Sequence, residues 1–223
     1  MAGSGFGTNF RITTWGETHG AGVGVVVDGC PAGLPLERED VQKYLDRRKP
    51  GQSKYTTQRK EGDQVEILSG IFEGRTTGTP ISMVVYNKDQ RSKDYSNIKD
   101  IYRPGHADFT FDMKYGFRDY RGGGRSSGRE TIGRVAAGAV AAKVLKELGI
   151  EIKAYAKAIA GIEVSKDHFD FAEMNNNPFN MPDKEAAKLV QEKADQMIKE
   201  MDSIGGIIEC QITGMPVGIG ETV

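Results

Sequence analysis

The chain is poor in the residues that build disulfide frameworks, zinc sites and membrane spans. Its 223 residues include only two cysteines, Cys30 and Cys210, and three histidines. Two cysteines so far apart fit free thiols in a reducing cytosol, and the few histidines give no zinc-binding pattern. No run of about 18 apolar residues predicts a membrane span, and the first residues lack the features of a secretory signal. We therefore expect a cytoplasmic protein with no metal site and no membrane partner.

Net charge is also small, and the formal value of −1 argues against a general nucleic-acid binder. The charges are nevertheless segregated along the chain. Seven basic residues and one acid lie from Lys43 to Lys60, seven basic residues and four acids from Arg103 to Arg134, and thirteen acids with seven lysines from Glu147 to Glu209. The two basic blocks indicate a local anion site. Two solvated loops that pair with the acidic segment would give the same pattern, and charge alone does not decide between these readings.

The hydrophobic pattern predicts a mixed order of helices and strands. Helices are expected over residues 37–48, 128–148 and 183–201, and strands over residues 9–15, 22–28, 64–72, 80–86, 150–160 and 205–213. Ser127 and Glu130 fit a capping box at the start of the second helix, and Gly149 fits its C-terminal cap. Residues 87–127 are polar and show no clear period, which in a compact domain usually marks a functional loop. The mixed order favours an α+β fold over a regular βαβ alternation.

Glycine is the abundant residue, and it gathers where the charges suggest a ligand. There are 29 glycines, about twice the average share. The richest segment, Arg121–Glu130, places Arg125, Ser126, Ser127 and Arg129 directly before the predicted helix. Free backbone amides, the helix dipole and two guanidinium groups all favour an anion such as phosphate. A capped helix preceded by a flexible glycine loop remains the alternative reading.

Two of the three histidines lie in turns that could serve chemistry. His106 lies between an arginine and an aspartate in Arg103–Asp108, where it could act as a general acid near neutral pH. His19 is flanked by glycines in Gly16–Gly20, so its ring could reach a ligand. The alternative for His106 is an exposed loop histidine without a function, and the alternative for His19 is a histidine in an ordinary turn. His168 stands in an acidic stretch with no motif and is expected to be structural or exposed.

The basic end of the first predicted helix has two readings. Arg47–Lys54 carries a cluster of cations followed by a Pro-Gly turn. Cations at a helix C-terminus interact favourably with the helix dipole, which is a purely structural reading. The functional reading is a mobile basic lid over a polyanionic pocket.

Taken together and in this order, these segments resemble the chorismate synthase family, and the likeness runs from end to end of the chain. The segments that carry it are Gly16–Gly20 with Val25–Gly29 and Pro31, Asp46–Gly51, Thr76–Pro80, Arg103–Asp108, Asp119–Ser127, and Arg125–Thr131 with Arg134–Gly138. Each motif is modestly specific, and their joint occurrence is the strong signal.

The resemblance implies a carbon–oxygen lyase that converts 5-enolpyruvylshikimate 3-phosphate to chorismate by anti-1,4-elimination of phosphate. This is the last common step of the shikimate pathway to aromatic amino acids, and it requires reduced FMN although no net redox change occurs. The implied fold is a β-α-β sandwich, with helices between antiparallel sheets, assembled as a homotetramer. Residues 1–223 would form a single, truncated domain, the N-terminal portion of that sandwich.

The resemblance also implies roles for individual residues. His19 would face the substrate phosphate and assist its departure, and His106 would protonate or stabilise the reduced flavin. The sets implied to bind ligands are Arg48, Arg103 and Arg129 for substrate, Arg125, Ser126 and Ser127 for FMN, and Arg48 with Lys54 for NADP. NADPH as the flavin reductant is an option that the sequence leaves open.

Two departures from the family pattern matter. Gly128 stands where alanine is more common, and Val223 corresponds to a midpoint of the family sequence. Residues 1–223 alone are therefore expected to bind FMN weakly or not at all and to have no turnover. A non-catalytic phosphate-binding or subunit-interaction module is the rival hypothesis. An RNA-binding protein is disfavoured because an aromatic stacking platform is not evident and the net charge is wrong.

Overall fold

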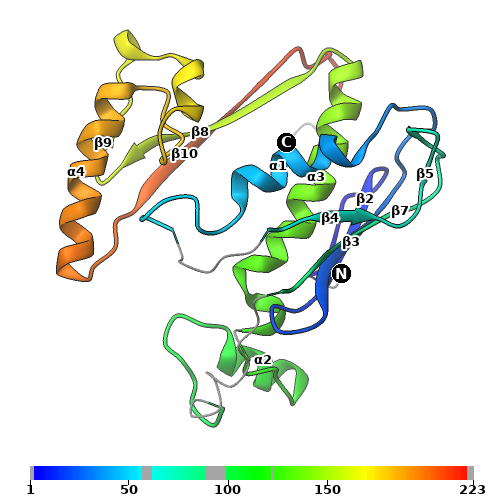
Figure 1. Ribbon diagram of the computed structural model, residues 1–223, viewed down its shortest axis with the longest axis horizontal. Coiled ribbons are helices and arrows are strands. Elements are labelled where there is room, and N and C mark those ends of the chain that lie inside the picture. Colours follow the sequence, from blue (N-terminus) through cyan, green and yellow to red (C-terminus); the bar gives the residue numbers. More distant parts are fainter. Residues whose placement is uncertain (1–2, 57–61, 89–98, 122, 220–223) are drawn as a thin grey trace. The chain divides into compact units, whose positions relative to one another are not determined.

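The structure of the protein is a computed structural model that describes residues 3–56, 62–88, 99–121 and 123–219 (Figure 1). Internal contacts divide the chain into two compact units. The first comprises Met1–Gly51 and Gln58–Leu145, and the second comprises Gln52–Thr57 and Lys146–Val223. The expectation of a single domain over residues 1–223 stays a prediction, and each unit is described by itself.

The first unit is built on a five-stranded antiparallel sheet with the order β1-β2-β3-β7-β4. Its strands are β1 (Gly5–Phe6), β2 (Arg11–Gly16), β3 (Gly22–Asp28), β7 (Ile81–Tyr86) and β4 (Val65–Ile67). A small hairpin joins β5 (Ile71–Phe72) to β6 (Arg75–Thr76). The strands predicted over residues 9–15, 22–28 and 80–86 are confirmed. The single strand predicted over residues 64–72 is wrong, because Gly70 takes a positive φ of 82° and separates β4 from β5.

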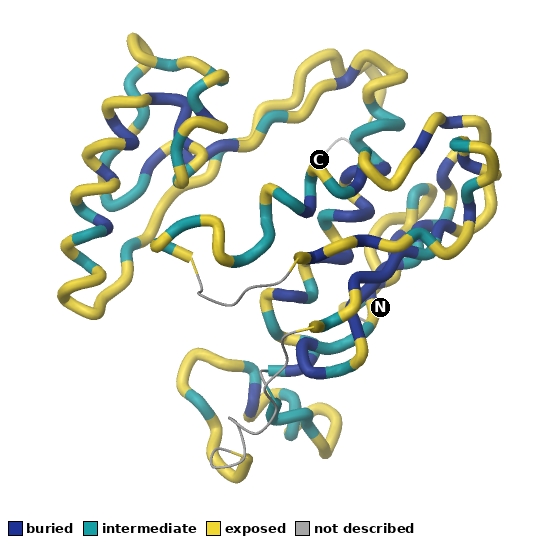
Figure 2. Tube along the Cα trace, in the orientation of Figure 1, coloured by how far each residue is buried: buried dark blue, intermediate teal, exposed yellow. Residues whose placement is uncertain are grey.

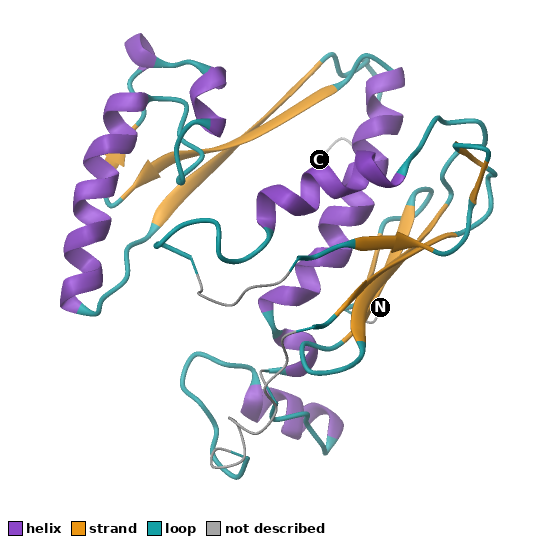
Figure 3. Cartoon of the chain, in the orientation of Figure 1, coloured by secondary structure: helices purple, strands orange, loops and turns teal. Residues whose placement is uncertain are grey.

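Two helices cover one face of this sheet (Figures 1 and 3). They are α1 (Arg38–Arg48) and α3 (Thr131–Glu147), in the places that the periodicity predicts. Figure 2 shows buried residues along the central strands and along the inner side of both helices. The largest of them form one core, which includes Val23, Val25, Val27, Val41, Leu45, Val65, Ile81, Met83, Val85, Ile132 and Val140.

Helix α3 begins differently from the predicted capping box. A short 3-10 turn over Gly128–Glu130 precedes it, and the Ser127 hydroxyl accepts a hydrogen bond from the Arg129 amide at 3.3 Å. The Glu130 carboxylate instead accepts from the Thr14 hydroxyl at 2.5 Å and from Arg134 at 3.0 Å. Glu130 therefore ties the start of the helix to β2.

The polar segment 87–127 contains a helix that the sequence reading missed. Helix α2 spans Asp108–Tyr115 and ends at Gly116, which caps it in the left-handed conformation with a φ of 71°. Its apolar side chains Phe109, Met113 and Tyr115 are exposed, so the segment has no buried stripe that periodicity could reveal. Residues 89–98 of the same segment lie outside the described residues.

The second unit is a small α+β structure. Its antiparallel sheet has the order β10-β8-β9, formed by β10 (Gly206–Thr213), β8 (Glu151–Ile159) and β9 (Ile162–Glu163). Helix α4 (Lys184–Glu200) packs on it through Ala186, Ala187 and Val190. The strands predicted over residues 150–160 and 205–213 and the helix over 183–201 are confirmed. Both units thus combine helices with antiparallel sheets, as the α+β prediction requires. No helix in the described ranges is long and apolar enough to cross a membrane.

Asp183, the N-cap of α4, holds three backbone amides. Its buried carboxylate accepts from Ser165 at 3.0 Å, Glu185 at 2.9 Å and Ala186 at 3.0 Å. Burial by itself would raise the pKa of Asp183, but these backbone donors lower it overall. We expect Asp183→Ala to lower the free energy of unfolding by about 0.5–2 kcal/mol, the usual cost of a lost N-cap.

Urea titrations followed by circular dichroism at several pH values measure this loss. Because the folded pKa lies below the unfolded value of about 3.9, the carboxylate's contribution is fully present above that value. It is lost as the pH falls through the folded pKa. The difference between wild type and Asp183→Ala should therefore be constant near neutral pH and shrink below about pH 4. A difference that stays constant on acidification would contradict this assignment.

Candidate functional site

The antiparallel register brings four strand ends together at one end of the first sheet. They are the end of β2, the start of β3, the end of β7 and the start of β4. Strand β3 begins opposite the end of β7, with Gly22 paired to Tyr86. Strand β4 begins beside the same end, with Val65 paired to Val85. The turn from β2 to β3, the residue after β7 and the residues before β4 therefore lie together. The candidate site forms at this end of the sheet, and the turn that precedes α3 contacts β2 and β3 there.

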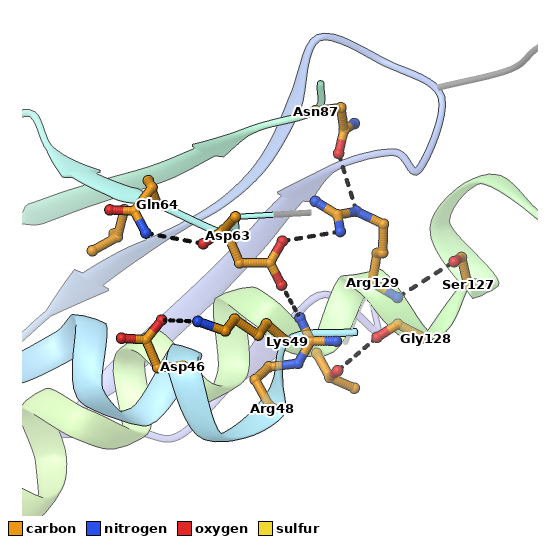
Figure 4. A network of polar contacts seen from close by, with 12 residues as sticks. Asp46, Arg48, Lys49, Asp63, Gln64, Asn87, Ser127, Gly128 and Arg129 are labelled. Atoms are coloured by element: carbon orange, nitrogen blue, oxygen red, sulfur yellow. Dashed lines mark hydrogen bonds and ion pairs between the residues drawn. The ribbon is translucent and has the colours of Figure 1, made fainter. Parts of the chain in front are cut away.

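Two of the predicted substrate arginines meet on a buried aspartate there (Figure 4). Arg48 ends α1, and its Nη1 lies 3.1 Å from Oδ2 of Asp63. Arg129 precedes α3, and its Nη1 lies 3.0 Å from Oδ1 of the same carboxylate. The side chain of Asp63 is 0% exposed and that of Arg129 is 7% exposed. Each carboxylate oxygen thus receives one guanidinium.

The Arg48–Asp63–Arg129 cluster carries one positive charge in excess. Burial lowers the pKa of the Arg48 guanidinium, the Asp63 carboxylate opposes this, and the charge of Arg129 adds to it. Guanidinium groups nevertheless stay protonated in proteins. Nη2 of Arg129 is a buried side-chain nitrogen without a hydrogen-bond partner among the described residues. A buried donor left unsatisfied costs about 1–3 kcal/mol, so this N–H group is suited to donate a hydrogen bond to an oxygen of an anionic ligand.

Asn87, the first residue after β7, joins this cluster to the turn that holds His19. Its Oδ1 accepts from Nε of Arg129 at 3.1 Å, and its Nδ2 donates to the carbonyls of Glu17 and Gly20 at 2.9 Å each. His19 is 7% exposed within the turn so held. The side chain of Asn87 therefore connects Arg129, a predicted substrate ligand, to the backbone of the turn that carries His19.

The glycine-rich loop packs against this turn and uses its polar side chains internally. The Thr18 hydroxyl donates to the Gly124 carbonyl at 3.3 Å. Arg125 donates to Gly16 O at 3.0 Å and to the Thr14 hydroxyl at 2.8 Å, and Ser126 donates to Gly123 O at 2.7 Å. Two glycines of the loop have positive φ values, 84° at Gly123 and 53° at Gly124. The side chains thus fix the loop.

A cavity of 610 Å³ lies beside this loop. Its size falls in the usual range of cofactor and ligand sites, about 300–1,000 Å³. Its wall carries three carboxylates, from Glu17, Asp119 and Glu130, together with the aromatic and basic side chains of Phe111, Tyr115, Phe117, Lys114, Arg118, Arg125 and Arg134. Several of them come from α2 and the residues after it, in the segment 87–127 that the sequence marks as a functional loop without assigning these side chains a role. Within the described ranges, no group of three or more His, Cys, Asp or Glu side chains is placed to hold a metal ion.

The turn that carries His106 is closed by an ion pair. Arg103 donates through Nε and Nη2 to the two oxygens of Asp108, at 2.8 and 2.9 Å, and Arg118 Nη1 lies 3.0 Å from the same carboxylate. Hydrogen bonds from Arg103 hold the pKa of the Asp108 carboxyl well below its usual range. The His106 side chain is exposed, and its Nδ1 lies 3.0 Å from the carbonyl of Pro104. The substrate role of Arg103 stays a prediction.

Lys54 belongs to the second unit, where its Nζ lies 2.7 Å from Asp195. The hydroxyl of Tyr55 donates to the same carboxylate at 2.8 Å. The joint role of Arg48 and Lys54 in binding NADP stays a prediction. His168 is exposed and lies 3.4 Å from Glu185, as expected for a residue outside the site. Two further cations of the first basic block, Arg59 and Lys60, lie outside the described residues.

Comparison with known proteins decides the family. The family model for chorismate synthase matches residues 10–223. This chain belongs to the chorismate synthase family. Chorismate synthase of Lachnospira eligens is 70% identical over 221 residues, which cover 99% of this chain and 60% of that protein. Chorismate synthase of Agathobacter rectalis is 63% identical over 223 residues, which cover 100% of this chain and 61% of that protein.

A solved chorismate synthase structure has the same fold. It matches with a TM-score of 0.74 and 31% identity, over 94% of this chain and 59% of that chain. The chorismate synthase-like α+β fold expected from the sequence is therefore confirmed. The chain spans about 60% of the length of the chorismate synthases named above.

Proposed function

We propose that the protein containing this chain is a chorismate synthase, which eliminates phosphate from 5-enolpyruvylshikimate 3-phosphate to give chorismate. The observation that supports this most directly is the buried Arg48–Asp63–Arg129 cluster. Its net positive charge suits an anionic substrate, and so does Nη2 of Arg129, which has no hydrogen-bond partner in the part of the chain that the structure describes. The identity of 70% to a chorismate synthase supports the same conclusion.

Arg129 and Arg48 would hold the anionic groups of the substrate, with Arg103 as a further candidate. A guanidinium presents planar donors that match carboxylate and phosphate oxygens. His19 would give a proton to the departing phosphate. Asn87 would help in this role, since it connects the turn that carries His19 to Arg129, which would bind the substrate. A positioned general acid of this kind typically contributes about 10²–10⁴ to the rate.

The cavity beside the glycine-rich loop is the place where we propose that FMN binds. The loop that carries Arg125, Ser126 and Ser127 leads into the N-terminus of α3, which favours a phosphate. Aromatic rings and cations on the cavity wall suit a flat ring system and its phosphate tail. When bound, reduced FMN would supply electron density while the phosphate leaves. His106 would hold a proton for the flavin ring.

The remaining assignments are proposals of the same kind. Arg48 and Lys54 would contact NADPH if the enzyme reduces its own flavin. We also propose a cytoplasmic homotetramer that has a small phosphorylated substrate and does not bind nucleic acid.

The test is direct. The complete gene product, with reduced FMN under anaerobic conditions, should convert 5-enolpyruvylshikimate 3-phosphate to chorismate and release equal amounts of phosphate. Absorbance of chorismate and a phosphate assay measure the two products. Phosphate binding without any turnover would instead favour the non-catalytic module. For residues 1–223 alone we expect no turnover and weak FMN binding, and tight binding in a flavin-fluorescence titration would contradict that expectation.

A further inference from the structure

We propose that Asp63 is a positioning residue for the substrate arginines, an inference that rests on the proposed function. Asp63 itself would touch neither substrate nor flavin. Its role would be to fix the two guanidinium groups of Arg48 and Arg129, so that Nη2 of Arg129 is presented to an anion in one orientation.

The backbone of Asp63 is held in an unusual conformation. Its φ is +42°, a region that non-glycine residues rarely adopt and that costs on the order of 1 kcal/mol or more. Gln42 of α1 holds the segment, because its Nε2 donates to Asp63 O at 3.2 Å and its Oε1 accepts from Val65 N at 3.0 Å. Arg38 of the same helix donates to Val65 O at 2.9 Å. Side chains of helix α1 therefore hold the backbone of Asp63 and Val65 in place, and with it the Asp63 carboxylate.

The contacts of Arg129 determine where its last donor points. Its Nη1 lies 3.0 Å from Asp63 Oδ1, and its Nε donates to Asn87 Oδ1 at 3.1 Å. Because a guanidinium is planar, fixing two of its nitrogens fixes the direction of the third. The other oxygen of Asp63, Oδ2, lies 3.1 Å from Nη1 of Arg48, so the carboxylate also sets the spacing of the two cations.

Stability alone does not explain this arrangement. A buried ion pair is weak evidence for stabilisation, since desolvation can exceed the Coulombic gain. Here the second cation, Arg48, adds to the desolvation cost, and so does the Nη2 group of Arg129, which is unsatisfied among the described residues. The cluster makes better physical sense as a pre-organised anion site.

Asp63→Asn in the complete gene product tests the inference. The variant keeps the shape of the side chain but removes its charge and turns one oxygen into a donor. We expect kcat/KM for 5-enolpyruvylshikimate 3-phosphate to fall about 10- to 100-fold, because misplacement by about 1 Å can cost that much. FMN affinity, measured by fluorescence, should stay within about twofold, because Asp63 is not among the residues that line the FMN cavity.

Binding of inorganic phosphate, measured by calorimetry, separates positioning from charge and does not depend on turnover. Removing a negative charge would by itself tighten phosphate binding, whereas loss of positioning weakens it. We expect binding about 10-fold weaker in Asp63→Asn, and no full recovery in Asp63→Glu, whose charge sits one methylene further out. Asp63→Glu also serves if Asp63→Asn fails to fold.

Asp28→Asn is the matched control. It removes an exposed aspartate that pairs with Arg11 at 3.2 Å in the same unit, and it should behave as wild type. Unchanged kcat/KM and equal or tighter phosphate binding in Asp63→Asn would overturn the inference, as would a wild-type protein that does not bind phosphate. A wild-type protein that binds phosphate but forms no chorismate would refute only the proposed function, and phosphate binding by the variants would still decide the role of Asp63.

Discussion

Replacing His19 with alanine should slow chorismate formation by roughly 10²–10⁴-fold, the loss expected for a missing general acid. The structure supports a large effect because this side chain is 7% exposed and its turn is fixed. Asn87 holds the carbonyls on both sides of His19, and Thr18 anchors the turn to the glycine-rich loop. The backbone that carries the imidazole is therefore held in place.

Steady-state assays of the complete gene product, with reduced FMN supplied, measure this loss. His168→Ala is the control, because His168 is exposed in the second unit and should leave turnover unchanged. We expect His106→Ala to lose a comparable factor, although its side chain is exposed. Wild-type rates in His19→Ala and His106→Ala would refute both assignments.

The sequence could predict the arginines of the site but not the residues that organise them. Arg48 and Arg129 stand in basic segments next to helix ends, which is a local signal. Asp63 and Asn87 are single polar residues beside strands and carry no such signal. They meet the arginines only because β7 pairs with both β3 and β4, which brings distant strand ends together at one end of the sheet. That pairing follows from the tertiary fold and not from any window of sequence.

The fold itself was more accessible than the roles of individual side chains. The β-branched run of β3 is largely buried, and so are Ile132, Ala136, Ala139 and Val140 on one stripe of α3, so the sequence pattern of both elements is strong. Helix α2 was missed because its large apolar side chains are exposed. The sequence marks Arg125 as an anion donor, yet its guanidinium donates to carbonyl and hydroxyl groups of the first unit. Charge predicts that an arginine is available, and only the contacts show which partner it has.

A second large effect is expected at Gly133, where α3 packs tightly against the sheet. A β-carbon there would lie 2.9 Å from the Gly24 carbonyl oxygen and 3.0 Å from Cγ2 of Thr14. The neighbour at 2.9 Å is backbone of the central strand β3, so the helix itself must move. Gly133→Ala should therefore lose stability, by a net amount on the order of 1–2 kcal/mol, because overpacking exceeds the helix propensity that alanine gains.

The same substitution at Gly128 gives the control. A β-carbon at Gly128 meets no atom within 4 Å, and its φ is not positive, so Gly128→Ala should be neutral or more stable by about 0.4–1 kcal/mol. Urea denaturation of both variants measures the difference, and equal stabilities would show that α3 does not need this close approach. Because α3 starts just after Arg129, a displaced helix should also disturb the contact between Arg129 and Asp63. Gly133→Ala is therefore expected to lower kcat/KM as well as stability, whereas Gly128→Ala should lower neither.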